Sequence, residues 1–135
     1  MSLKLAVSFV AAVVATSAIA AAPAHAIDSN IARQLNKLDP QERREQRCDI
    51  EAMSQIAKAD GGFQPDKVIA YSRADIVEQG NDIRAPGAVF RSAGDWYKLK
   101  FKCRTGSEGL DIVSFDYKIG DKIPRSEWDR LYLYD

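Results

Sequence analysis

Histidine is nearly absent from this chain of 135 residues, which has a single one, at position 25. The sequence after that position holds no imidazole, which excludes histidine triads, histidine general acid–base catalysis and histidine metal ligands there. Serines in this part, such as Ser114, therefore have no histidine to activate them. A serine–lysine pair, for example Ser114 with Lys100, stays open as an alternative.

Long apolar runs are also missing, except near the N-terminus. Lys4 is followed by apolar and small residues from Leu5 to Ala22, and Ala24–Ala26 has the small-x-small pattern that signal peptidase cleaves. We therefore expect residues 1–26 to be a signal peptide. The alternative is a permanent membrane anchor, but the run is rich in alanine and about 18 residues long, against roughly 20 for a spanning helix. No cysteine lies at the cleavage point, so a lipoprotein is not expected.

An excess of charge of either sign is absent too. The 19 Lys and Arg residues balance 19 Asp and Glu residues, and loss of Lys4 with the signal peptide would leave a net charge of −1. Nucleic-acid binders are usually basic overall, so no nucleic-acid partner is expected. The segment Asp60–Asp66 offers too few oxygen ligands for a calcium loop, and no other pattern indicates a metal or a cofactor. Residues 27–135 suffice for one small domain with a modest core.

Two helices are expected at the start of this domain, over residues 30–38 and 40–59. Asp39 is a good N-cap for the longer helix, and Pro40 suits its first position. Apolar residues of the longer helix recur with helical spacing and share one face: Cys48, Ala52, Met53, Ile56 and Ala57. Cys48 therefore points at whatever this helix covers.

Strand-like alternation begins after residue 64. It predicts strands over residues 67–73, 87–92, 96–104 and 110–118, a connector over 74–80 and a short closing helix over 124–131. We expect an α+β domain in which two N-terminal helices pack on an antiparallel sheet of about four strands, with a short C-terminal helix and one disulfide.

The register of the sheet follows from its loops. A symmetric loop over residues 105–109 would place Phe101 opposite Val113 and Lys98 opposite Asp116. In the preceding hairpin, the expected opposite pairs are Phe90 with Tyr97, Ala88 with Leu99 and Arg91 with Trp96. One face of the sheet then becomes apolar, as a covering helix requires.

The two cysteines of the chain, Cys48 and Cys103, are expected to form a disulfide. An even number of cysteines is typical of disulfides in exported domains. Helical spacing places Cys48 on the covering helix face, and alternation places Cys103 on the apolar sheet face. Closing a loop of about 55 residues should stabilise the domain by roughly 4 kcal/mol in the chain-entropy model. The alternative is two buried free thiols.

Five motifs resemble those of one family. They are Leu-Asp-Pro-x-x-Arg-x-Glu-Gln-Arg-Cys-Asp-x-Glu-Ala-Met (Leu38–Met53), Pro-Asp-Lys-Val-Ile-Ala-Tyr (Pro65–Tyr71), Gly-Ala-Val-Phe-Arg (Gly87–Arg91), Trp-Tyr-Lys-Leu (Trp96–Leu99) and Ile-Pro-Arg-x-x-Trp (Ile123–Trp128). The chain from about Leu38 onward resembles the exported alphaproteobacterial family known as domain of unknown function nine-thirty. The resemblance implies one domain and an envelope location, and it supplies no catalytic residues.

The strand over residues 96–104 carries the main candidate binding site. Its outward face, which we call the basic strand face, consists of Lys98, Lys100 and Lys102, flanked by Trp96 and Arg104, with Arg91 opposite Trp96. Cations beside an aromatic ring could hold anionic lipid headgroups, acidic polysaccharide or peptidoglycan. The alternative is an ordinary solvated sheet face.

Three arginines near the start of the longer helix, Arg43, Arg44 and Arg47, form a second cationic cluster. Positive charge at a helix N-terminus opposes the macrodipole, so helix stability does not explain them. They either bind anions or, mixed with two glutamates, form surface pairs or tie the helix to a neighbouring element. The glutamates favour the second interpretation.

These features predict a non-catalytic periplasmic or envelope protein that binds an anionic envelope polymer, a lipid or a protein partner. One alternative is a secreted effector or enzyme inhibitor that acts on an outside partner. Another is a small hydrolase using carboxylates such as Asp111 and Asp116, although a strand would place these two on opposite faces.

Overall fold

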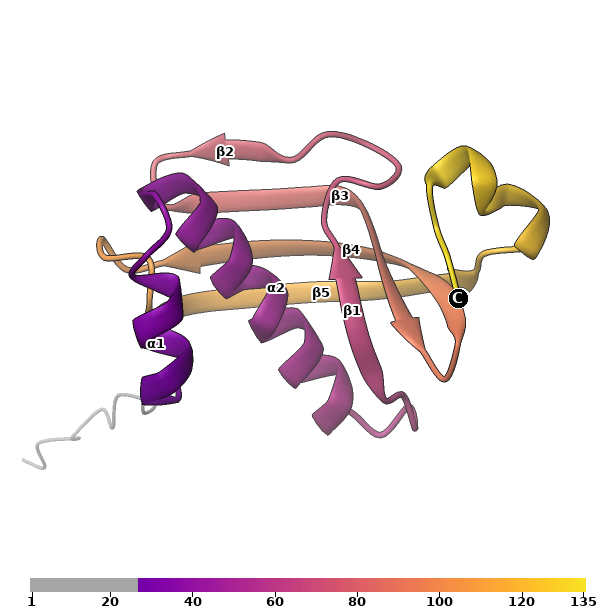
Figure 1. Ribbon diagram of the computed structural model, residues 1–135, viewed down its shortest axis with the longest axis horizontal. Coiled ribbons are helices and arrows are strands. Elements are labelled where there is room, and N and C mark those ends of the chain that lie inside the picture. Colours follow the sequence, from indigo (N-terminus) through magenta and orange to yellow (C-terminus); the bar gives the residue numbers. More distant parts are fainter. Residues whose placement is uncertain (1–26) are drawn as a thin grey trace, which may run out of the picture.

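The computed structural model describes residues 27–135. The expected signal peptide, residues 1–26, lies outside the described residues. Among the described helices, none is both long and apolar enough to cross a membrane. The described chain forms two layers, in which helices pack on one side of an antiparallel sheet (Figure 1).

Two helices precede the sheet, α1 (Ser29–Leu35) and α2 (Pro40–Lys58). Asp39 caps α2 as predicted, because its carboxylate accepts the backbone N–H groups of Gln41 and Glu42 at 3.0 Å. The buried face of α2 includes Cys48, Ala52 and Ile56, whereas Ala57 is exposed. The buried face of the helix also includes Arg47 and Glu51, which its apolar spacing does not predict.

The sheet has five strands: β1 (Pro65–Ile69), β2 (Val77–Gln79), β3 (Asp82–Ser92), β4 (Asp95–Thr105) and β5 (Ile112–Lys122). The order is β1-β3-β4-β5, and β2 also pairs with β3. Strands β1 and β2 pair with the same edge of β3, at different positions along it: β1 pairs with residues 89–92 and β2 with residues 82–84. The short β2 lies in the segment predicted as a connector, which brings the expected four strands to five.

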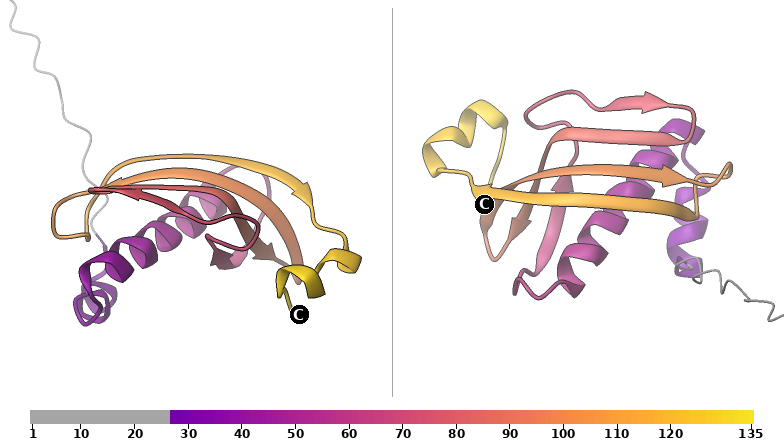
Figure 2. Two further views of the ribbon diagram at one scale, coloured as in Figure 1. Left: turned by 90° about the horizontal axis from the view of Figure 1, so that it is seen from above. Right: turned by 180° about the vertical axis from the view of Figure 1, so that it is seen from behind.

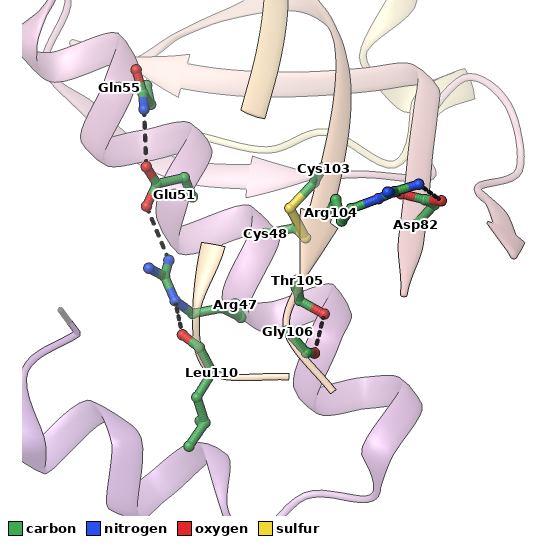
Figure 3. The surroundings of a disulfide bond; sticks show 10 residues. All are labelled: Arg47, Cys48, Glu51, Gln55, Asp82, Cys103, Arg104, Thr105, Gly106 and Leu110. Atoms are coloured by element: carbon green, nitrogen blue, oxygen red, sulfur yellow. Dashed lines mark hydrogen bonds and ion pairs between the residues drawn. A yellow bond between two sulfur atoms is a disulfide. The ribbon is translucent and has the colours of Figure 1, made fainter. Parts of the chain in front are cut away.

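The main core lies between α2 and the concave side of the sheet, which arches over the helix (Figure 2). Phe90, Leu99 and Phe101 from the sheet pack there with Ala52 and Ile56 of α2. Cys48 and Cys103 meet in this core and form the predicted disulfide, which is drawn in Figure 3.

A second, smaller core forms near the β3–β4 hairpin. It contains Val89, Trp96, Ile123, Trp128, Leu131 and Leu133. The closing helix predicted over residues 124–131 is instead two short 3-10 helices, η1 (Arg125–Glu127) and η2 (Asp129–Leu131). This C-terminal segment lies at one end of the sheet and covers Val89 and Trp96, whose neighbours Phe90 and Tyr97 face the main core.

The register predicted for β4 and β5 is wrong by four residues. Phe101 lies opposite Tyr117 rather than Val113, and Asp116 lies opposite Lys102 rather than Lys98. The hairpin loop is longer than expected, since Thr105 pairs with Ile112. By contrast, all three pairs predicted for the β3–β4 hairpin are confirmed: Phe90 with Tyr97, Ala88 with Leu99 and Arg91 with Trp96.

The longer loop, residues 106–111, is held by arginines of α2. Arg43 Nη1 donates a hydrogen bond to the Glu108 carbonyl at 3.1 Å. Arg47 Nε donates one to the Leu110 carbonyl at 2.7 Å, which is drawn in Figure 3. The prediction that these arginines tie α2 to a neighbouring element is confirmed for both. The loop conformation, and with it the register of β5, thus depends on contacts with a helix more than 60 residues away in sequence.

Candidate functional site

The side of the sheet away from α2 carries the predicted lysines. We call this side the open face; it is the convex side of the arch and faces the viewer in the right panel of Figure 2. Lys100 and Lys102 are exposed there and Lys98 is half-buried, while the alternating residues Leu99 and Phe101 are buried in the main core. The predicted alternation of β4 is confirmed in this part of the strand.

The observed register brings further cations beside these lysines. Lys100 lies directly opposite Lys118 of β5, and Lys102 lies directly opposite Arg84 of β3. None of these four residues forms an ion pair within 4.0 Å in the described part of the chain, although Asp116 lies across from Lys102. We call Arg84, Lys100, Lys102 and Lys118 the basic quartet.

Sequence periodicity alone does not single out Arg84 or Lys118. Each alternates correctly within its own strand, but their proximity to Lys102 and Lys100 depends on the pairing of β3 and β5 with β4. The predicted register of β5 pairs Lys98 with Asp116 and so gives a partly neutralised face. The observed register of β5 instead places Lys118 opposite Lys100 and Asp116 opposite Lys102.

The basic quartet borders a hollow of about 480 Å³ on the open face. Val77 of β2 and Pro86 of β3 contribute apolar walls. Pro86 lies at the irregularity in β3 pairing between Ala85 and Ala88, opposite the Lys100 region. The site is therefore an open, cationic hollow with one carboxylate, Asp116, at its border.

Trp96 is not part of this site, although strand alternation places it on the same face of β4 as the lysines. Its side chain is 0% exposed and packs in the second core beneath the C-terminal segment. Its indole N–H donates a hydrogen bond to the Tyr134 carbonyl at 2.8 Å. The expectation that Trp96 flanks the lysines as a ligand-binding aromatic is therefore wrong, because residues far along the chain cover this end of the face.

The two predicted arginines of the site are each paired with a carboxylate. Arg91 binds both oxygens of Asp66 at 2.9 and 3.0 Å and lies over the rings of Trp96 and Tyr134. Arg104 binds both oxygens of Asp82 at 2.6 and 2.7 Å. These hydrogen bonds hold the pKa values of Asp66 and Asp82 below their ordinary values. Both arginines are thus neutralised locally, whereas the basic quartet and the neighbouring Lys98 form no ion pair among the described residues.

A separate group of acids lies between α2 and β2. Burial and the neighbouring Glu45 raise the pKa of Asp49 to about 7. Burial and the same Glu45 also raise the pKa of Glu78 on β2. Asp49 Oδ1 and Glu78 Oε1 are buried without hydrogen-bond partners among the described residues. Within residues 27–135, no group of three or more His, Cys, Asp and Glu residues is arranged to hold a metal ion.

These features define a two-layer α+β domain with one sheet face covered by a helix and the other largely open and basic. Residues 35–133 match the model of the family described as Domain of Unknown Function (DUF930), and the chain belongs to this family. No curated protein and no solved structure matches it. The family description assigns no activity, so the function has to be argued from the residues.

Proposed function

We propose that this protein is a non-catalytic binder of an anionic component of the cell envelope, and that the basic quartet holds the ligand. The observation that carries the proposal is the pairing of like charges. Lys100 with Lys118, and Arg84 with Lys102, are directly opposite neighbours in adjacent strands. Like charges in this position lower sheet stability. Folding therefore does not account for them, whereas an anionic ligand placed between them would.

The local character of the charge supports the same function. The full chain has no net charge, so its attraction for anions in general is weak. A cluster of unpaired cations on an otherwise neutral protein instead favours anions that contact this one face. The hollow beside the quartet offers space for such a ligand in contact with several cations at once.

The envelope location is also a proposal, supported by two features. Residues 1–26 have the pattern of a cleavable signal peptide, and disulfides such as Cys48–Cys103 persist mainly in oxidising compartments outside the cytoplasm. N-terminal sequencing of protein recovered from the periplasm or medium should begin at Ile27. Recovery of the uncleaved chain from the membrane fraction would contradict cleavage and indicate an anchor.

Binding is tested by removing the charges of the quartet. We expect the variant with Arg84, Lys100, Lys102 and Lys118 all changed to Gln to lose retention on purified cell-wall sacculi and on anionic vesicles. The matched control changes four exposed basic residues elsewhere to Gln: Arg33, Lys37, Lys58 and Arg130. Both variants have the same net charge, so a loss confined to the first assigns binding to the open face. Equal retention of parent and both variants at every salt concentration would contradict the proposal.

A further inference from the structure

The hollow at the basic quartet is one part of a longer trough on the open face. A second hollow of about 280 Å³ shares Arg84 and Lys102 with it and extends toward Gln79 and Ser114. A third hollow of about 450 Å³ shares Lys100 and Lys118 with it and extends toward Arg73 and Asp121. The three hollows therefore follow one another along β4.

The length of this trough is set by β4. Its outward residues run from Lys98 to Arg104, and a strand rises by about 3.3 Å per residue, so the trough is about 20 Å long. The lysines on this face of β4 recur every second residue, about 7 Å apart. Such spacing suits a ligand whose negative charges also recur along a chain.

The charges along the trough are predominantly positive from end to end. Six basic residues without an ion pair in the described chain line it, against the two unpaired acids Asp116 and Asp121: Arg73, Arg84, Lys98, Lys100, Lys102 and Lys118. At one end, Arg73 Nε is buried and has no hydrogen-bond partner among the described residues. The positive charge is thus distributed along the strand rather than focused on one point, as a site for a single small anion would require.

The apolar side chains near the trough do not favour a bilayer surface. Interfacial binding requires a set of aromatic or large aliphatic side chains that enter the lipid. Besides Val77 and Pro86, the 480 Å³ hollow is lined by Phe101 and Tyr117, but Phe101 is buried in the main core and Tyr117 packs against that core. Trp96 is buried in the second core. The most exposed aromatic residue of the described chain, Tyr132, follows η2 rather than lining the trough.

We infer that the ligand of the open face is an acidic polysaccharide, bound as an extended chain along β4 with its anionic groups between the cations of the trough. This inference rests on the proposed function and names the ligand class for the same site. Each additional sugar that carries a carboxylate gains a contact with a further cation. Affinity therefore rises with the length of the oligomer until the oligomer spans the trough.

The probe is a series of galacturonate oligomers of defined length, with one carboxylate per sugar, titrated against the mature protein by calorimetry at low ionic strength. We expect the hexamer to bind at least about tenfold more tightly than the dimer, which corresponds to about 1.4 kcal/mol. Affinity should fall with added salt, because exposed charges are screened. Phosphatidylglycerol vesicles are titrated in parallel to test whether the ligand is instead an anionic lipid.

Lys98→Gln tests the extended binding mode, since Lys98 lies at one end of the trough and outside the basic quartet. It should lower the affinity for the hexamer several-fold and leave the affinity for the dimer unchanged, because a dimer can occupy the quartet alone. Lys58→Gln on α2 is the control and should change neither. Circular dichroism and thermal unfolding of both variants establish that they fold.

Three outcomes would overturn the inference. Equal affinity for galacturonate and its hexamer would show a site for a single anionic group rather than an extended one. Binding to vesicles but to no oligomer would show a lipid ligand. Both leave the proposed anion-binding function in place. Binding to neither oligomers nor vesicles, together with unchanged retention of the quartet variant on sacculi, would overturn the inference and the proposed function together.

Discussion

The Cys48 sulfur of α2 is bonded to the Cys103 sulfur of β4, 55 residues further along the chain, within the main core (Figure 3). This bond closes a loop that contains most of α2 and strands β1 to β3. Changing both cysteines to Ala should lower the free energy of unfolding by about 4 kcal/mol, because the unfolded chain gains conformational freedom. Urea unfolding followed by circular dichroism measures the effect.

Reduction of the parent provides the control for this prediction. The parent in dithiothreitol should unfold near the urea concentration of the double variant, and the variant itself should not respond to the reductant. A parent that unfolds at the same urea concentration with and without reductant would show that the bond contributes nothing to stability.

Asp49 should make the protein less stable at neutral pH than at mildly acidic pH. Burial and Glu45 raise the pKa of its carboxyl to about 7 in the folded state, from an ordinary 3.8. The folded state therefore binds more protons than the unfolded state between these values, and stability is lost as the pH rises through about 7. The loss is on the order of a few kcal/mol. Asp49→Asn should remove this pH dependence and raise the unfolding temperature at pH 8.

Other charged groups near Asp49 need a matched control. Glu45 and Glu78 are close by, the pKa of Glu78 is raised as well, and Arg44 acts on Glu78 in the opposite direction. Asp111→Asn removes the same group at an exposed position and should leave the pH profile of the parent unchanged. A pH profile that is equally steep in parent and Asp49→Asn would contradict the role of this residue.

Gly87 should be intolerant of any side chain. A Cβ atom at this position would lie 2.3 Å from the Ala74 backbone nitrogen and 2.8 Å from the Arg73 carbonyl carbon. The segment cannot move away freely, because the Arg73 N–H donates a hydrogen bond to the Gly87 carbonyl at 2.9 Å. We expect Gly87→Ala to lower the free energy of unfolding by about 1–3 kcal/mol. Gly106→Ala, whose Cβ would be 3.7 Å from its nearest neighbour, should change it little.

Arg47 should be more important for stability than its position on α2 suggests. Its side chain is buried and binds both Glu51 at 3.1 Å and the Leu110 carbonyl at 2.7 Å. Arg47→Ala leaves Glu51 buried without its cation, which should cost about 3–5 kcal/mol. Arg130→Ala removes an exposed arginine paired with Glu127 and should cost less than about 1 kcal/mol. A similar decrease in the free energy of unfolding for the two variants, measured by urea unfolding, would contradict this difference.

The pairing of Cys48 with Cys103 was predictable because helical spacing and strand alternation each place one cysteine on an interior face. The position of Trp96 was not, since alternation gives the side of the sheet but says nothing about a distant segment that covers it. The register of β5 was missed for a related reason. It depends on the loop that Arg43 and Arg47 hold, a long-range contact without a local pattern.

The same dependence on distant contacts separated the predicted site from the observed one. The lysines of β4 were identified from their own strand. Arg84 and Lys118 lie beside these lysines because of strand pairing. Arg91 and Arg104 form ion pairs with Asp66 and Asp82 and are therefore not free to bind an anion.

The second core also bears on the order in which the protein folds. Trp96 becomes covered only when residues 123–133, which supply Ile123, Trp128, Leu131 and Leu133, are in place. Until then, the β3–β4 hairpin presents a large aromatic side chain to solvent. A nascent chain that still lacks these residues leaves Trp96 without its cover, so the second core can be completed only after the last residues of the chain have been synthesised.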